Sequence, residues 1–168
     1  MLRKLVLKNK NLSKNFLKKL NDNAHLDSFS KKLVSFDKKY NDFALFISDY
    51  ETYLSINMEH PPSNLSDKDK IFEGIIYRLD TLSVFKNITL KIYLESQKNP
   101  KYFLTINKFI ISYFKSFLKS PLDMTKAYFI YVYAFNIWIE DDSSMDKTMA
   151  AIGKSFEGLN RFESLFKK

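Results

Sequence analysis

The chain has 168 residues, of which 45 % are hydrophobic, and its formal net charge is +8. This length fits one domain with a buried core, and a content of only three glycines and four prolines argues against the many tight turns of an all-β protein. The absence of cysteine excludes disulfides, thiolate metal sites and a cysteine nucleophile, and it fits a cytoplasmic location. We therefore expect an all-α protein of about nine helices.

Four short helices are predicted before the two prolines at 61 and 62. Ser13 is a candidate N-cap for the first, and Ser48 or Asp49 opens the fourth, which has to end before Pro61. The expected ranges are 14–21, 29–34, 38–46 and 48–58.

About five longer helices are predicted after these prolines. Ser66 and Asp69 have the spacing of a capping box, which marks the start of the first of them. The expected ranges are 66–85, 88–97, 102–119, 128–139 and 145–166, and the last two form a helical hairpin. The longest apolar run, 127–139, is shorter than the roughly 20 residues of a membrane span, so no transmembrane segment is expected.

The positive charge is concentrated at the N-terminal end. Residues 1–40 hold eleven lysines or arginines and three acids, a difference of +8, whereas the remaining residues hold sixteen of each. A basic head on a neutral body is typical of a protein that faces a polyanion such as nucleic acid. The candidate DNA contacts are Lys31, Lys32, Lys38, Lys39, Tyr40 and Asn41.

Two other interpretations of the basic head stay open. The first residues alternate apolar side chains with lysines, a pattern that also suits an anionic membrane surface. A lysine-rich face that is merely solvated is the third interpretation.

The acidic turn Glu140–Asp142, followed by Ser143, Ser144 and Asp146, is the clearest carboxylate cluster. A metal site is one interpretation. A helix cap is favoured, in which Ser143 or Ser144 caps the last helix and the acids complement its dipole. His25 and His60 stand alone, and the sequence contains no catalytic motif. We therefore expect no catalytic residue, no metal and no cofactor, and we expect that the protein is not an enzyme.

Aromatic residues recur at helical spacing in the second half of the chain. They are typical of a packed core, and a hydrophobic ligand cavity is the alternative. The candidate pocket residues are Tyr113, Phe114, Phe117, Tyr131, Phe135, Asn136 and Trp138.

The order of these parts resembles a TetR-type transcriptional regulator. The segments that carry the resemblance are FSKKLVSFDKKYNDFALFISDYETYL, DKDKIFEGIIYRLDTLSVFKN and WIEDDSSMDKTMAAIGKSFEGL. The last two are similar to the TetR-type subgroup that resembles the lipid-binding accessory protein of ubiquinone biosynthesis. The resemblance implies a helix-turn-helix-like head over 1–47 and a ligand-binding and dimerisation body over 48–168.

In such a regulator the recognition helix would begin at Lys38, and the partners would be double-stranded DNA and a second copy of the chain. The dimer interface is expected on the last helix, at Met149, Ile152, Phe156, Leu159 and Phe162. In the regulator the body would hold a hydrophobic small molecule. The alternative function is that of the ubiquinone-related proteins, which have lost DNA binding and hold an isoprenoid lipid between the body helices.

Overall fold

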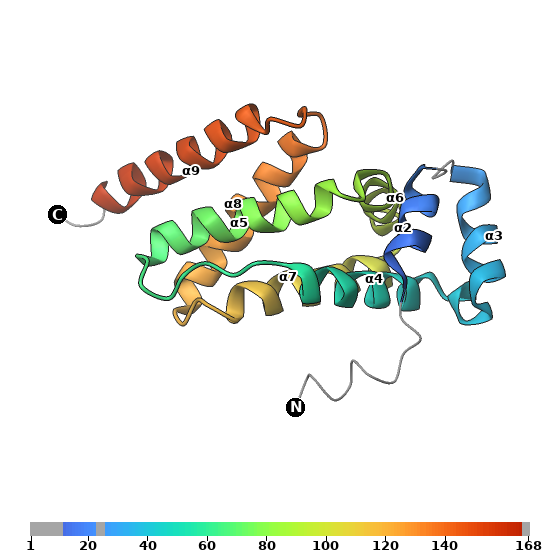
Figure 1. The fold of residues 1–168 in the computed structure, drawn as a ribbon. Helices are drawn as coiled ribbons and strands as arrows, with labels where there is room; N and C mark the ends of the chain where they lie inside the picture. The colour runs from blue at the N-terminus through green and yellow to red at the C-terminus, as the bar shows by residue number, and fades with distance from the viewer. Residues whose placement is uncertain (1–11, 23–25, 166–168) are drawn as a thin grey trace. The chain divides into compact units, whose positions relative to one another are not determined.

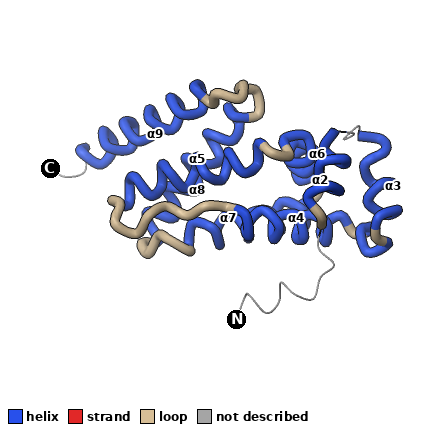
Figure 2. Tube along the Cα trace, viewed as in Figure 1, coloured by secondary structure: helices blue, strands red, loops and turns tan. Residues whose placement is uncertain are grey.

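The computed structural model describes residues 12–22 and 26–165, and every regular element in these ranges is a helix (Figures 1 and 2). The all-α prediction is confirmed. The elements are α2 (Lys14–Asp22), α3 (Leu26–Phe36), the 3-10 helix η2 (Lys38–Asn41), α4 (Phe43–Asn57), α5 (Asp67–Ser83), α6 (Lys86–Ser96), α7 (Pro100–Lys115), α8 (Pro121–Trp138) and α9 (Asp146–Leu165). In the described ranges no helix combines the length and the apolar character that crossing a bilayer requires.

The prediction of one helix over 38–46 and another from Ser48 is wrong. Aspartates at both ends of η2 accept backbone hydrogen bonds, Asp37 from the amide of Lys39 and Asp42 from the amide of Ala44, both at 3.0 Å. These local bonds replace helical ones, so the chain makes a four-residue turn and starts a new helix after Asp42. Residues 48 and 49 consequently lie inside α4.

Two compact units make up the chain, and the first consists of residues up to 57 together with 84–109. Its core is aromatic: the Phe46 ring is fully buried and its centroid lies 5.6 Å from that of Phe29 and 6.0 Å from that of Tyr50. The hydroxyls of Tyr50 and Thr89 are hydrogen-bonded at 3.0 Å, which ties α4 to α6. The side-chain oxygen of Asn21, at the end of α2, accepts the amide of Asn87 at 3.0 Å.

The second unit consists of residues 58–83 together with those from 110 onward. Helices α8 and α9 pack against each other as the predicted hairpin, and α5 packs on α8. The predicted start of this helix is confirmed, because the Ser66 hydroxyl accepts the amide of Asp69 at 3.2 Å and α5 begins one residue after Ser66. The Asp69 carboxylate accepts the Ser66 hydroxyl, so this pair supplies the serine half of a capping box. The functional boundary at residue 47 stays a prediction, since the two units are defined by packing alone.

Candidate functional site

The lysines of the predicted DNA-binding set differ in exposure. Lys31 on α3 and Lys38 on η2 are exposed, as is Asn41, whereas Lys32 and Lys39 are half-buried. The buried Phe29 and Leu33 hold α3 by its apolar face, so Lys31 lies on the outer side.

Three further exposed lysines, Lys14, Lys18 and Lys19, lie on α2. Lys14 and Lys18 flank the side of the helix on which Leu17 and Leu20 are buried. Sequence reasoning did not include these lysines among the DNA contacts, although lysines flanking an apolar stripe in the basic head were a usable signal.

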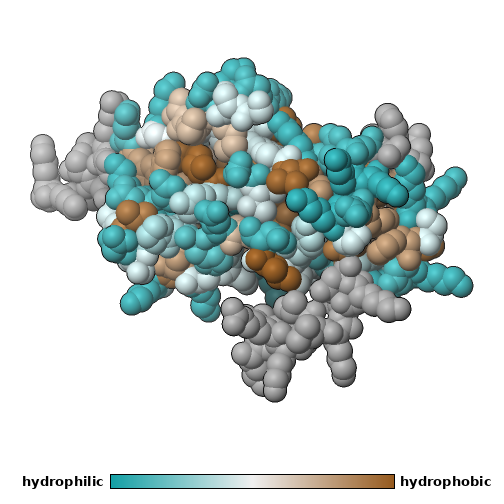
Figure 3. All heavy atoms as spheres, in the orientation of Figure 1, coloured by the Kyte–Doolittle hydropathy of each residue, from teal (hydrophilic) through white to brown (hydrophobic). Residues whose placement is uncertain are grey.

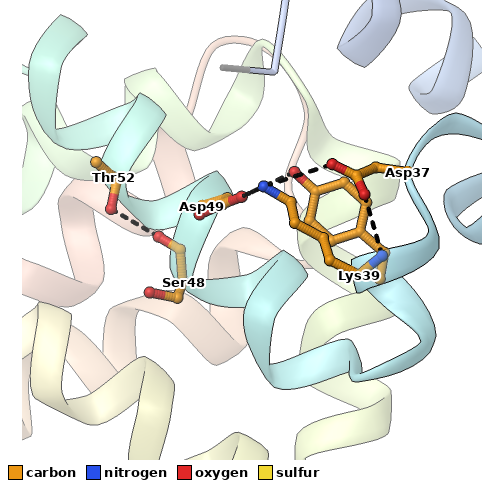
Figure 4. Close-up of polar contacts among 6 residues, drawn as sticks. Asp37, Lys39, Ser48, Asp49 and Thr52 are labelled. Atoms are coloured by element: carbon orange, nitrogen blue, oxygen red, sulfur yellow. Dashed lines mark hydrogen bonds and ion pairs between the residues drawn. The ribbon is translucent and has the colours of Figure 1, made fainter. Parts of the chain in front are cut away.

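Lys39 and Tyr40 are both held by one carboxylate from α4 (Figure 4). Asp49 Oδ2 lies 2.7 Å from Lys39 Nζ and accepts a hydrogen bond of 2.8 Å from the Tyr40 hydroxyl. Tyr40 is 2 % exposed, and burial, together with its bond to Asp49, raises the pKa of the phenol far above its usual range. These two side chains therefore stabilise the turn after α3, and Lys38 and Asn41 are the exposed members of the predicted recognition set.

A recognition helix starting at Lys38 does not form in the described chain. The segment Lys38–Asn41 is a single 3-10 turn between Asp37 and Asp42. A turn of this length presents fewer side chains to a major groove than the recognition helix of a helix-turn-helix does.

Most of the candidate pocket residues form a packed cluster. Tyr113, Phe114, Tyr131 and Trp138 are buried, and Phe117 and Phe135 are half-buried. Ring centroids lie 6.0 Å apart for Phe114 and Tyr131, 5.1 Å apart for Tyr113 and Phe117, and 5.4 Å apart for Phe135 and Trp138. These are ordinary distances between packed aromatic rings, which favours the core interpretation.

The polar atoms of this cluster also bond to the protein. The Tyr113 hydroxyl lies 3.0 Å from the carbonyl of Glu59 and 3.1 Å from that of Gly74. Asn136 lies on the exposed side of α8, where its amide donates to the carbonyl of Val132 at 2.7 Å, so it does not line the cluster.

A buried arginine completes the cluster and was missed by sequence reasoning. Arg78 is 1 % exposed, its Nε donates to the Tyr131 hydroxyl at 3.2 Å, and its guanidinium carbon lies 5.5 Å from the centre of that ring. The signal was its position: Arg78 continues the apolar stripe of Ile71, Ile75 and Leu79, where a charged side chain is unusual.

The predicted dimer residues on α9 face two ways. Ile152 is fully buried and Phe156 is 7 % exposed, with Lys68 Nζ 5.5 Å from the centre of its ring, so both belong to the interior of their own unit. Ile152 and Phe156 lie on a helix that packs on α8 within one chain, so a second subunit is not needed to bury them. Met149 is 37 % exposed. The side chains of Leu159 and Phe162 lie outside the described part of the structure.

The acidic turn caps α9, as predicted, although through a different residue. Asp141 Oδ2 accepts hydrogen bonds from the amide and the hydroxyl of Thr148, at 2.8 and 2.7 Å. Ser144 contributes a longer contact, 3.4 Å from its hydroxyl to the amide of Asp146. Within the described ranges no group of three His, Cys, Asp or Glu side chains is placed to hold a metal ion. His60 packs edge-on against Tyr113 at 5.4 Å, and His25 lies outside the described residues.

This cap predicts an acid-sensitive hairpin. The hydrogen bonds from Thr148 lower the pKa of Asp141 below its ordinary value of 3.8. A lowered pKa in the folded state adds stability above the ordinary pKa, and this stability is lost as the pH falls through the folded value. Thermal melts followed by circular dichroism between about pH 6 and about pH 2, roughly two units to each side of the ordinary value, should show a falling midpoint temperature, and Asp141→Asn should flatten that fall.

The matched control is Asp80→Asn, which changes an exposed carboxylate on α5. Its pH profile should follow that of the unaltered protein. If the profiles of both variants coincide, the cap contributes nothing to the acid sensitivity.

The geometry thus brings together exposed lysines on α2, α3 and η2 in one unit, and a packed aromatic cluster with a capped hairpin in the other. No protein-family model, no curated protein and no solved structure matches the chain.

Proposed function

We propose that this protein is a TetR-like, homodimeric transcriptional regulator that binds duplex DNA chiefly through the phosphate backbone. The observation that carries the proposal is the charge distribution, since the whole excess of +8 falls within residues 1–40. Lys14, Lys18, Lys31 and Lys38, on α2, α3 and η2, are exposed. Lysines placed in this way neutralise phosphates and release counterions, which is the main source of affinity in non-specific DNA binding.

Base reading has weaker support than phosphate contact. Lys39 and Tyr40 are engaged by Asp49, which leaves Lys38 and Asn41 as exposed candidates for base edges. We therefore expect a modest preference among DNA sequences.

The outer face of α8 supports the homodimer. Leu122, Phe129, Val132 and Tyr133 are 62 %, 67 %, 37 % and 53 % exposed, and their spacing places them on one side of the helix. An isologous dimer brings the same patch of both copies together about a two-fold axis, and large apolar side chains favour such burial. Lys126, which lies on the same side of α8, is paired with Asp123 at 3.8 Å within the chain. Met149 of α9, which packs on α8, extends the apolar character of the hairpin. This arrangement moves the proposed interface from the inner stripe of α9 to the outer face of α8.

Titration of a dye-labelled duplex, followed by fluorescence anisotropy, tests the proposed DNA binding. The logarithm of the affinity should fall with the logarithm of the salt concentration by about 0.9 for each phosphate contacted. Lys31→Glu combined with Lys38→Glu should weaken binding by about tenfold or more and reduce the salt slope by about two. Circular dichroism should show unchanged helicity, since both side chains are exposed.

Lys154→Glu is the matched control, because Lys154 is an exposed lysine on α9 in the other unit. It should leave the affinity within about twofold of the original value. If Lys154→Glu lowers the affinity for the duplex as much as Lys31→Glu with Lys38→Glu does, only the net charge of the protein matters. If the original protein does not bind the duplex at low salt, the proposal is wrong.

A further inference from the structure

One carboxylate of the first unit holds a lysine of the basic head. Asp49 Oδ2 lies 2.7 Å from Lys39 Nζ, which is the distance of a strong charge-assisted hydrogen bond, and the two side chains come from α4 and η2 (Figure 4). The side chains of Lys39 and Asp49 are 33 % and 24 % exposed, so the pair lies at the border between the protein and the solvent. The charge of this lysine is therefore compensated inside the chain.

A buried neighbour fixes the position of the Asp49 carboxylate. The Tyr40 hydroxyl donates to the same carboxylate oxygen at 2.8 Å, and Tyr40 is 2 % exposed. Its ring packs edge-on against Phe46, with the centroids 5.5 Å apart, and Lys39 Nζ lies 4.8 Å from the centre of the Tyr40 ring. Because Tyr40 cannot move without opening the core of the first unit, Asp49 stays in place beside Lys39. An ion pair with one fixed partner loses less side-chain freedom than a pair of two mobile side chains.

A second carboxylate contacts the same lysine more loosely. Asp37 Oδ2 lies 3.8 Å from Lys39 Nζ, and the Asp37 side chain is 43 % exposed. Its other oxygen accepts the amide of Lys39 at 3.0 Å as the cap of η2. The shorter and less exposed of two ion pairs is the stronger one, so Asp49 is the main restraint on Lys39.

Lys39 lies beside a lysine that is exposed. Lys38 and Lys39 are consecutive residues of η2, and Lys38 is one of the proposed phosphate contacts. A lysine carries its ammonium group on a flexible stem of four carbons, so rotation of this stem would bring Lys39 Nζ from Asp49 to a phosphate near Lys38. Hydrophilic side chains dominate the face that Figure 3 shows, and a partner that approaches this face meets polar groups first.

We propose that Asp49 is an internal competitor for DNA phosphate that withholds Lys39 from the duplex, an inference that rests on the proposed DNA binding. The carboxylate and a backbone phosphate both present anionic oxygens to an ammonium group, so they compete for Lys39. Asp49 acts through Lys39 and is in this sense a positioning residue. Its presence lowers the affinity of the basic head for DNA.

Two costs keep Lys39 on Asp49 when the duplex binds. Breaking the pair forfeits a charge-assisted hydrogen bond, which is worth about tenfold in an equilibrium constant. It also leaves a half-buried carboxylate uncompensated beside a polyanion. One phosphate contact is worth about tenfold at about 50 mM salt, which offsets the first cost and leaves the second. Lys39 therefore becomes a phosphate contact only when the carboxylate is removed.

Fluorescence anisotropy with the dye-labelled duplex tests the inference through a gain of affinity. Asp49→Asn keeps an acceptor for the Tyr40 hydroxyl and releases Lys39. This variant should bind the duplex about tenfold more tightly at about 50 mM salt, and its salt slope should be steeper by about 0.9. A variant that merely perturbs the fold would lose affinity, and circular dichroism should show unchanged helicity.

A double-mutant cycle shows whether the gain passes through Lys39. Lys39→Gln alone should leave the salt slope unchanged, whereas Lys38→Gln, which removes an exposed lysine, should lower it by about 0.9. In the Lys39→Gln background, Asp49→Asn should raise the affinity by no more than about threefold and should not change the salt slope.

Asp22→Asn is the matched control for net charge, because Asp22 is an exposed carboxylate of the same unit. It changes the net charge as Asp49→Asn does. The affinity of Asp22→Asn should stay within about twofold of the original value, and its salt slope should not change.

Four results would overturn the inference alone, provided that the original protein binds the duplex. They are an unchanged affinity of Asp49→Asn, an equal gain from Asp22→Asn, a full gain from Asp49→Asn in the Lys39→Gln background, and a loss of salt slope in Lys39→Gln equal to that in Lys38→Gln. Absence of binding by both the original protein and Asp49→Asn would overturn the proposed function together with this inference.

Discussion

Replacing Trp138 by alanine will lower the free energy of unfolding by about 3–5 kcal/mol. Trp138 is the largest of the fully buried side chains and is 1 % exposed. Its truncation removes a ring whose centroid lies 5.4 Å from that of Phe135, and it leaves a cavity in the core of the second unit. It also removes the hydrogen bond of 3.2 Å from Nε1 to the Ser83 hydroxyl, which joins α8 to the end of α5. Urea unfolding measures the loss in the free energy of unfolding. The unfolding is followed by circular dichroism at about 222 nm, where helices give a strong negative ellipticity.

Two further variants separate the contributions of packing and hydrogen bonding. Trp138→Phe keeps an aromatic ring and removes the donor, so it should cost less than the alanine variant. Phe103→Ala removes an aromatic side chain that is 51 % exposed and lies outside the proposed interface, and its effect should stay within about 0.5 kcal/mol. Equal destabilisation by Trp138→Ala and Phe103→Ala would contradict the assignment of Trp138 to the core.

Phe129→Glu will convert the proposed homodimer into a monomer. A carboxylate at the centre of the apolar face of α8 would meet its symmetry mate across a two-fold interface, where desolvation and like-charge repulsion both oppose association. The side chain is mostly exposed in the single chain, so folding should be preserved. Size-exclusion chromatography with light scattering measures the molar mass, which should fall by about half.

Val84→Glu provides the comparison, because Val84 is a 58 % exposed apolar residue outside α8. This variant should keep the mass of the original protein. The proposed interface has to be abandoned if Phe129→Glu keeps the dimer mass, and the homodimer itself if the original chain is already a monomer.

Apolar periodicity and capping signals were sufficient to predict most helices. The stripe of Ile71, Ile75, Leu79 and Leu82 predicted α5, and Ser66 marked its start to within one residue. The prediction failed over 38–46, because side-chain hydrogen bonds from Asp37 and Asp42 compete with helical ones over a few residues. A pattern averaged over several turns does not resolve such competition.

The candidate site was harder to predict than the helices. Apolar periodicity indicates that a helix face is buried, but it does not identify the helix or subunit that covers this face. Ile152 and Phe156 belong to a regular stripe that fits either a second subunit or a neighbouring helix, and α8 covers it. Charge and the family resemblance placed Lys39 among the DNA contacts, and neither indicated the carboxylate that holds it, which lies ten residues further along the chain. Arg78 was overlooked because a buried arginine depends on a partner, Tyr131, that is distant in sequence.

The single tryptophan of the chain lies inside one of its two compact units. Its near-ultraviolet signal and emission therefore report on the second unit, whereas helical ellipticity averages over both. Comparing the two signals in one denaturation experiment shows whether the units unfold together or in sequence, because coincident transitions are a test of two-state behaviour. The protein thus carries an intrinsic probe for the cooperativity of its own architecture.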